Sequence, residues 1–270
     1  MQVREDTFTV KTYQCQADGS IKLYALMQHL QEAAAVQAEQ LGFGYDRLNQ
    51  MNSCWVLSNL RIEIDRLPQW NEKVTIATWP SGHNRVVATR EFLGKDHHAC
   101  ELFKAGSEWM VLDRQKNRPK NLLRLGLPLP ESGPKTMAEK LTRLEPRSSY
   151  SEVEHVRVPY SSIDLNGHAN NTEYVRWAMD ALKRTFQFKG SIRSAQVTYL
   201  AEVFEGDQID LLLLCSPPRF LSARFTRHTS GGQVADESEV AEACDRGEHF
   251  YILGKRTSQQ DNVYLMELDC

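Results

Sequence analysis

Two stretches of the chain share a helix-like spacing of apolar residues. Apolar side chains recur at i, i+3, i+4 and i+7 in "LMQHLQEAAAVQAEQLG" (residues 26–42) and again in "YVRWAMDALKRTFQFKG" (residues 174–190). At an offset of 148 residues Gly42 falls on Gly190, and each glycine suits the position just after a helix. The pattern predicts two long helices of about 16 residues, each ending at a glycine.

A repeated strand pattern follows each expected helix. Residues 61–78 ("RIEIDRLPQWNEKVTIAT") and 196–213 ("QVTYLAEVFEGDQIDLLL") align without gaps at an offset of 135, and both read as strand, polar turn, strand. Further strand-like runs cover residues 85–94, 101–113, 220–229, 233–243 and 249–253. One long helix followed by several antiparallel strands, used twice, predicts an α+β fold in which a sheet wraps each helix.

The two copies are separated by a proline-rich segment. Five prolines lie between residues 119 and 150, which is typical of a linker, and "TMAEKLTRL" (136–144) suits one short helix. We therefore expect an N-terminal unit over residues 1–125, a linker over 126–150 and a C-terminal unit over 151–270.

Composition narrows the class of protein. With 270 residues, 41% hydrophobic and 25% charged, the chain has enough apolar sequence for a large core, and a formal charge of −3 argues against nucleic acid as the main partner. No apolar run reaches the roughly 18–20 residues of a membrane span. The first residues show neither a signal nor a transit peptide, and the six cysteines form no C-x-x-C pair. We expect a cytoplasmic protein with reduced thiols.

Polar residues crowd the start of the second expected helix, in "SSIDLNGHANNTEYVRW" (161–177). A calcium loop is one reading, but its sixth position is Ala169 where glycine is needed and its twelfth is Val175 where glutamate is needed. A zinc site lacks a second His or Cys at helix spacing from His168. We expect no metal and no other cofactor.

A helix cap explains only part of this cluster. Asn170 or Asn171 can cap the helix, which leaves Asp164, Asn166 and His168 without a role. The first copy carries a different polar set at the matching positions, which favours a site over the shared scaffold for these residues. Glu202, just before a polar turn, is either a solvated strand end or a general base, and the second reading requires the fold to bring it to His168.

The spacing of these residues resembles that of a known enzyme family. Asp164-x-Asn166-x-His168-x-Asn170-Asn171-x-x-Tyr174, Tyr199-x-x-Glu202 and "SEWMVLDRQKNRP" (107–119) together resemble the acyl-ACP thioesterases of plants and bacteria, the Fat-type enzymes, with a matching layout over roughly residues 3–255. The resemblance implies a tandem (double) hotdog fold. It also implies that the catalytic residues are Asp164, Asn166, His168 and Glu202. Plant members have a cysteine after the glutamate where this chain has Val203, which favours activated water over a thiol nucleophile.

Hydrolysis of a thioester needs a nucleophile, an oxyanion site and a proton route. No G-x-S-x-G elbow is present, so water is the expected nucleophile. Glu202 and His168 are the candidates to orient and deprotonate it, and either one as base, or a covalent anhydride on Glu202, stays open. Asn166 is expected to hold the water or the Glu202 carboxylate, and Asp164 to fix the loop or the His168 tautomer. Backbone N–H groups at the start of the second helix suit the oxyanion.

The resemblance also assigns partners. Acylated acyl carrier protein would be the substrate, its fatty acyl chain would lie in the first half, and Trp55 or Met51 would set the depth, although core packing is an alternative for both. Residues 113–120 and 183–193 are basic and suit an acidic carrier, with a solvated surface as the alternative. We expect a monomer or homodimer that releases free fatty acid and so terminates fatty acid synthesis.

Three other functions fit the same fold. An acyl-CoA thioesterase shares the chemistry, but the fused and asymmetric pair of copies favours acyl carrier protein. A non-catalytic acyl-binding hotdog protein would not need Glu202 opposite His168. A dehydratase also pairs a histidine with an acid, and the asparagine-rich run around His168 argues against it.

Overall fold

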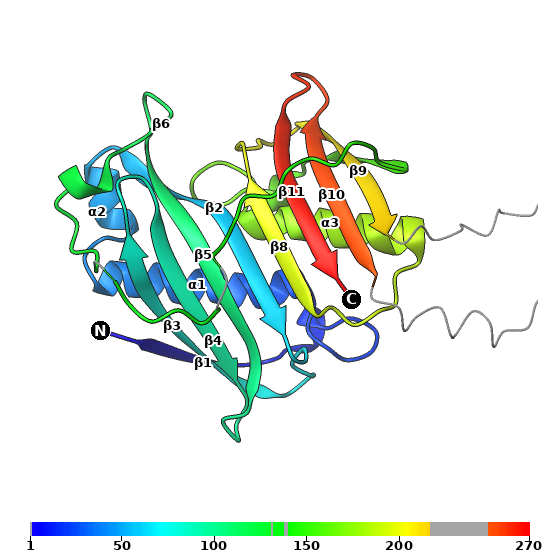
Figure 1. Cartoon of the computed structure of the whole chain (residues 1–270), viewed down its shortest axis with the longest axis horizontal. Helices are drawn as coiled ribbons and strands as arrows, with labels where there is room; N and C mark the ends of the chain where they lie inside the picture. Colours follow the sequence, from blue (N-terminus) through cyan, green and yellow to red (C-terminus); the bar gives the residue numbers. More distant parts are fainter. Residues whose placement is uncertain (1, 131, 138–139, 217–247) are drawn as a thin grey trace, which may run out of the picture.

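The computed structural model describes residues 2–130, 132–137, 140–216 and 248–270, and Figure 1 shows their arrangement. The first half contains strands β1 (Arg4–Thr9), β2 (Ser53–Ile64), β3 (Lys73–His83), β4 (Ala88–Lys95), β5 (Glu101–Asp113) and β6 (Arg118–Pro119). Its helices are α1 (Leu23–Gln40), α2 (Tyr45–Gln50) and the short 3-10 turns η1 (Thr12–Gln14) and η2 (Leu122–Arg124).

The second half repeats this plan with fewer strands among the described residues. It contains β7 (Glu152–Arg157), η3 (Tyr160–Ser162), α3 (Asn171–Phe186), β8 (Ser194–Tyr199), β9 (Gln208–Ser216), β10 (His249–Arg256) and β11 (Asn262–Asp269). The first residues of α1 and α3 are 148 positions apart, the same offset that the sequence repeat predicts.

The strands of the described residues form one antiparallel sheet, in the order β1-β3-β4-β5-β2-β8-β11-β10-β9-β7, with β6 added beside β5. The two halves meet where β2 pairs with β8, and there Arg61 lies directly opposite Gln196. These two residues are also equivalent in the sequence repeat, at the offset of 135. An approximate twofold axis therefore passes through the β2–β8 pair.

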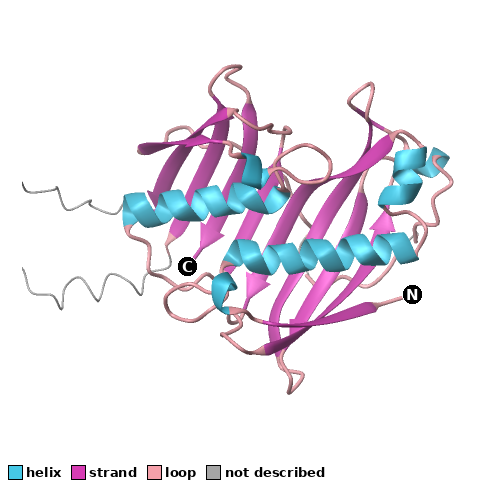
Figure 2. Ribbon diagram, turned by 180° about the vertical axis from the view of Figure 1, so that it is seen from behind, coloured by secondary structure: helices cyan, strands magenta, loops and turns pink. Residues whose placement is uncertain are grey.

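Helices α1 and α3 both lie against one face of the sheet, as Figure 2 shows. Their apolar stripes bury Leu26 and Leu30 of α1 and Val175 and Leu182 of α3 in a single core that continues across both halves. The segment between the halves crosses the opposite face, where the Thr142 carbonyl oxygen accepts hydrogen bonds from both halves. No helix in the described parts of the chain has the length and hydrophobicity needed to cross a membrane.

Several local predictions were wrong. Gly42 does adopt a left-handed conformation after α1 (φ +80°), but α3 already ends at Phe186, and Gln187 (φ 51°) takes that conformation instead of Gly190. The short helix expected over 136–144 is absent from the described residues of that segment, which form neither helix nor strand. Strands β1, β6, β7 and β11 have no counterpart among the predicted strands. The expected strands over 220–229 and 233–243 lie outside the described residues.

Candidate active site

The polar loop between η3 and α3 is held in one shape by its own hydrogen bonds. The Asp164 N–H donates to the His168 carbonyl oxygen (2.9 Å), and the Gly167 N–H donates to the Asp164 carbonyl oxygen (3.0 Å). Gly167 has a φ of +86°, a region that favours glycine. The Asp164 carboxylate accepts a hydrogen bond from the Asn166 N–H (2.8 Å). Asp164 was expected either to fix the loop or to fix the His168 tautomer, and these contacts place it to fix the loop.

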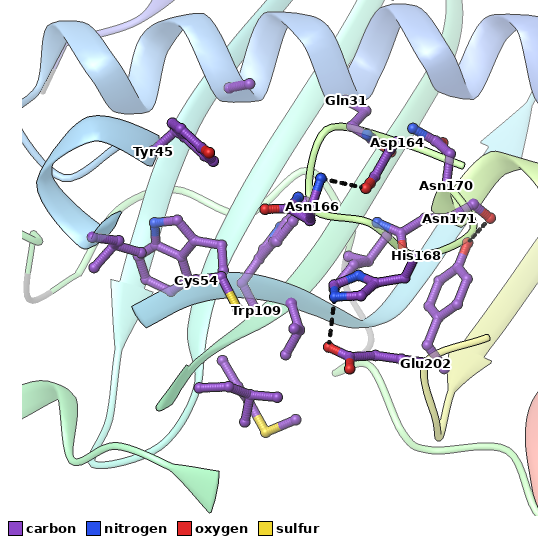
Figure 3. A pocket seen from close by; sticks show the side chains of 18 of the residues that line it. Gln31, Tyr45, Cys54, Trp109, Asp164, Asn166, His168, Asn170, Asn171 and Glu202 are labelled. Atoms are coloured by element: carbon purple, nitrogen blue, oxygen red, sulfur yellow. Dashed lines mark hydrogen bonds and ion pairs between the residues drawn. The ribbon is translucent and has the colours of Figure 1, made fainter. Parts of the chain in front are cut away.

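This loop brings the His168 imidazole to the Glu202 carboxylate (Figure 3). His168 Nε2 and Glu202 Oε1 lie 3.5 Å apart, and the two side chains are 20% and 29% exposed. The Ala169 N–H donates to the Val203 carbonyl oxygen (2.7 Å), which ties the loop to the segment after β8. A contact between two distant segments therefore sets the separation of the pair.

A buried arginine, Arg256, holds the backbone of Glu202 in place. Arg256 of β10 donates to the Glu202 carbonyl oxygen, and its Nε lies 3.6 Å from Asp207 Oδ2. The Phe204 ring meets the His168 ring edge to face at 5.8 Å. Val203 is fully buried, so its side chain packs in the core. Arg256 was not predicted as a site residue. Its position as a basic residue at the end of the apolar strand β10 could have indicated a buried contact.

Asn166 contacts the other half of the molecule. Its Oδ1 accepts a hydrogen bond from Arg114 Nη2 (3.0 Å), and Arg114 Nε also donates to the Ser53 carbonyl oxygen (3.3 Å). In the described part of the chain no hydrogen bond joins Asn166 to Glu202. The expectation that Asn166 binds the Glu202 carboxylate is therefore not met in this structure. Arg114 lies within 107–119, and nothing in the sequence connects it to Asn166.

The start of α3 combines a cap with a free donor. Asn170 Oδ1 accepts from the Thr172 N–H (3.0 Å) and hydroxyl (2.8 Å), so Asn170 is the helix cap. The Asn170 N–H donates to Ser162 and the Glu173 N–H to Asn170. Within the described ranges the Asn171 N–H has no acceptor. It is therefore available to a ligand at the positive end of the helix dipole.

A cavity of about 950 Å³ lies between the two halves, with Asp164, Asn166, His168 and Glu202 all on its wall. Three alanines of α1 line it, and their short side chains leave room for a ligand. Trp55 of β2 is also on the wall, with its Nε1 donating to the Phe43 carbonyl oxygen (2.7 Å). Met51 instead packs against a small apolar cluster around Leu48. Of the two residues expected to set the depth, only Trp55 lines the cavity.

Cys54 is the cysteine on this wall, beside the proposed site in Figure 3. Burial raises the pKa of its thiol, and the negative charges of Glu202 and Asp164 add to that effect while Arg114 opposes it. A thiol with a raised pKa is a poor nucleophile at neutral pH. This favours water as the attacking group. Among the described residues, no group of three His, Cys, Asp or Glu side chains is arranged to hold a metal ion.

Two family models match the chain. The acyl-ACP thioesterase N-terminal domain matches residues 2–124, and the acyl-ACP thioesterase C-terminal domain matches residues 145–240. The chain belongs to the acyl-ACP thioesterase family. As a member of this family it is a thioester hydrolase.

Relatives of this family member include two chloroplast enzymes of Arabidopsis thaliana. Oleoyl-acyl carrier protein thioesterase 2 is 22% identical over 259 residues, which cover 88% of this chain and 70% of the relative. Palmitoyl-acyl carrier protein thioesterase is 25% identical over 214 residues, which cover 74% of this chain and 52% of the relative. The chain thus spans between about half and 70% of the length of these relatives.

Solved structures agree on the fold. An acyl-ACP thioesterase from Bacteroides thetaiotaomicron has a TM-score of 0.76 at 24% identity, with 98% of this chain and 96% of that chain covered. The 12:0-ACP thioesterase from Umbellularia californica has a TM-score of 0.77 at 19% identity, with 99% and 93% covered. The predicted α+β fold of two hotdog halves is confirmed.

Proposed function

We propose that this thioesterase hydrolyses fatty acyl-ACP with water activated by Glu202 and His168. The observation that carries the proposal is the 3.5 Å separation of His168 Nε2 and Glu202 Oε1 on the wall of a cavity of about 950 Å³. A thioester carbonyl placed beside this pair would have its acyl chain directed along the alanines of α1. Release of free fatty acid would end chain elongation on the carrier.

Glu202 is the base in this proposal. A carboxylate base only accepts hydrogen bonds, so a proton on His168 Nε2 would face Glu202 and orient it. Glu202 takes a proton from water as the water oxygen attacks the carbonyl carbon. The same proton then passes to the sulfur as the C–S bond breaks, which yields the fatty acid and the carrier thiol.

The oxyanion would form at the start of α3. The Asn171 N–H has no acceptor among the described residues and lies at the helix N-terminus, where negative charge is stabilised. One oxyanion donor contributes roughly 10²- to 10³-fold to kcat. Asn166, held by Arg114, positions its side-chain amide on the same wall and would orient the water.

The turn between β5 and β6 is the proposed docking surface for the acidic carrier. Asn117 and Pro119 line the cavity, while Arg114, Lys116 and Arg118 are exposed. Residues 183–193 lie at the far end of α3, whose 16 residues span about 24 Å. Of the two basic segments, 113–120 is therefore the one beside the site.

The compartment proposed for this reaction is the cytoplasm. Cys15, Cys54 and Cys100 carry free thiols, which supports a reducing environment.

Steady-state hydrolysis of an acyl-ACP panel tests the proposal. We expect Glu202→Gln and His168→Ala to lower kcat by about 10²-fold or more, because the first removes the general base and the second removes the group that orients it. Glu205→Gln is the matched control, since Glu205 is an exposed acid of the same turn that does not line the cavity.

Each other outcome has a definite meaning. Hydrolysis of acyl-CoA but not acyl-ACP would show that the acyl group is carried by coenzyme A and not by acyl carrier protein. Full activity in folded Glu202→Gln and His168→Ala would refute the assigned site, and an inert wild type would refute the function.

A further inference from the structure

A buried guanidinium forms part of the cavity wall. Arg90 lies on β4, its side chain lines the cavity, and the residue is only 5% exposed. Its neighbour Phe92 faces the core on the same side of the strand. An arginine so removed from bulk water is unusual on a wall expected to hold an apolar chain.

The charge of Arg90 has no counter-ion among the described residues. Nη1 donates to Gln37 Oε1 and to Thr78 Oγ1 (3.1 Å), both neutral acceptors. The described residues supply no acceptor for Nε or Nη2, and no carboxylate forms an ion pair with the group. Glu91 points to the other face of the sheet, where it pairs with Lys135 (3.0 Å).

Burial lowers the pKa of Arg90 to about 10, and no nearby acid opposes this change. The group is still cationic at neutral pH. A buried cation without a counter-ion is costly, and an anionic or strongly accepting ligand lowers that cost.

A purely structural role for Arg90 would use only one nitrogen of its guanidinium, Nη1. Gln37 also donates to the Gln2 carbonyl oxygen (2.9 Å), so Arg90 Nη1 helps to hold α1 and the N-terminal segment. A neutral donor would serve there equally well. The positive charge and the other two nitrogens stay unexplained by this role.

Arg90 lies deep in the cavity relative to the proposed catalytic pair. The sheet register places Arg90 in one row with Ser107, Leu60 and Val197 of β8, the strand that precedes Glu202. Three strand spacings of about 4.8 Å separate β4 from β8, roughly 14 Å in all. A group bound at Arg90 would therefore sit far along an acyl chain whose thioester lies at Glu202.

We propose that Arg90 binds an oxygen function carried far along the acyl chain, a hydroxyl, carbonyl or carboxylate group, and that oxygenated acyl thioesters are substrates. This inference rests on the proposed hydrolysis of acyl thioesters and names their chemical class. The guanidinium Nε and Nη2 would donate to the oxygen, while the small residues of α1 leave space for the methylenes before it.

Matched pairs of acyl-ACP substrates test the inference. Each pair has one length, from eight to sixteen carbons, with one plain chain and one chain bearing a distal hydroxyl or carboxylate. At one length the wild type should favour the oxygenated member by about 10- to 100-fold in kcat/KM, as a hydrogen bond to a buried charge predicts. That ratio should collapse in Arg90→Met and persist in part in Arg90→Lys. Lys95→Met, on the same strand but away from the cavity wall, should keep the wild-type ratio.

Binding separates this inference from the hydrolytic function. Calorimetric titration of the Glu202→Gln variant with free hydroxy, dicarboxylic and plain fatty acids needs no turnover. Tighter binding of the oxygenated acids, together with no thioester hydrolysis by the wild type, would sustain the inference and reject the function. Hydrolysis that favours plain chains at every length, or an unchanged ratio in Arg90→Met, would overturn the inference alone. If Arg90→Met does not fold, the wild-type ratios decide.

Discussion

The hydrogen bond between Arg114 and Asn166 joins the first half to the proposed catalytic loop, and Arg114→Leu removes it. The Arg114 N–H donates to the Asn52 carbonyl oxygen (3.1 Å) and the Asn166 N–H is held by Asp164, so both backbones keep their anchors in the variant. The substitution also removes the Arg114 Nε hydrogen bond to the Ser53 carbonyl oxygen (3.3 Å), but within the proposed site its effect is on the orientation of the Asn166 amide. We expect kcat to fall while the fold is kept.

The size of this effect follows from exposure. A hydrogen bond to a charged group contributes about 1.5–3 kcal/mol where it is buried. Arg114 is exposed, and exposed charged contacts are worth about 1 kcal/mol or less. A loss of about 1 kcal/mol in the transition state corresponds to roughly a fivefold fall in kcat.

Because Arg114 also belongs to the proposed docking turn, the assay has to separate positioning from docking. An acyl-pantetheine substrate lacks the carrier, so a loss of kcat on it reports the Asn166 contact alone. Arg118→Leu is the matched control, since Arg118 is exposed on the same turn. It should raise KM for acyl-ACP and leave acyl-pantetheine hydrolysis unchanged.

A double-mutant cycle supplies the decisive comparison. If Arg114 acts through Asn166, Arg114→Leu should have little further effect in an Asn166→Ala background. Additive losses in the two variants, or an Arg114→Leu effect confined to acyl-ACP, would refute the positioning role.

Three further predictions concern the cavity, the loop and the pH dependence of stability. Trp55→Ala should shift the kcat/KM profile toward longer acyl chains, by about tenfold for two methylenes at about 0.8 kcal/mol each, whereas Met51→Ala, off the cavity wall, should leave the profile unchanged. Gly167→Ala places a side chain at φ +86° and should lower the free energy of unfolding by about 1 kcal/mol in denaturant titrations. Burial lowers the pKa of His29 below its ordinary 6.5 in the folded protein. In the acidic range the unfolded chain therefore binds more protons at this residue than the folded protein does. The free energy of unfolding should therefore fall as pH drops below about 6.5, and His29→Phe should reduce that slope.

Local pattern predicted most of the regular structure. The apolar spacing of residues 26–42 and 174–190 placed two helices at the correct offset, because burying one stripe of a helix requires that spacing. The strand over 101–113 is β5 at the same bounds. The sequence pattern missed β1, β6, β7 and β11, and it misplaced the end of α3, where Gln187 rather than Gly190 takes the left-handed conformation because tertiary contacts override local propensity.

The sequence by itself determined the repeat, the two helices, most described strands and the polar cluster whose spacing resembles the thioesterase family. The tertiary structure alone decided which groups meet. His168 lies 3.5 Å from Glu202 because the Ala169–Val203 bond joins two segments that no local pattern relates. Arg114 reaches Asn166 only because β2 pairs with β8 and brings the two halves together around one cavity. Arg90 lies on the wall of that cavity because β3, β4 and helix α1 meet beside it. Periodicity depends on near neighbours along the chain, whereas a site depends on distances between residues far apart in it.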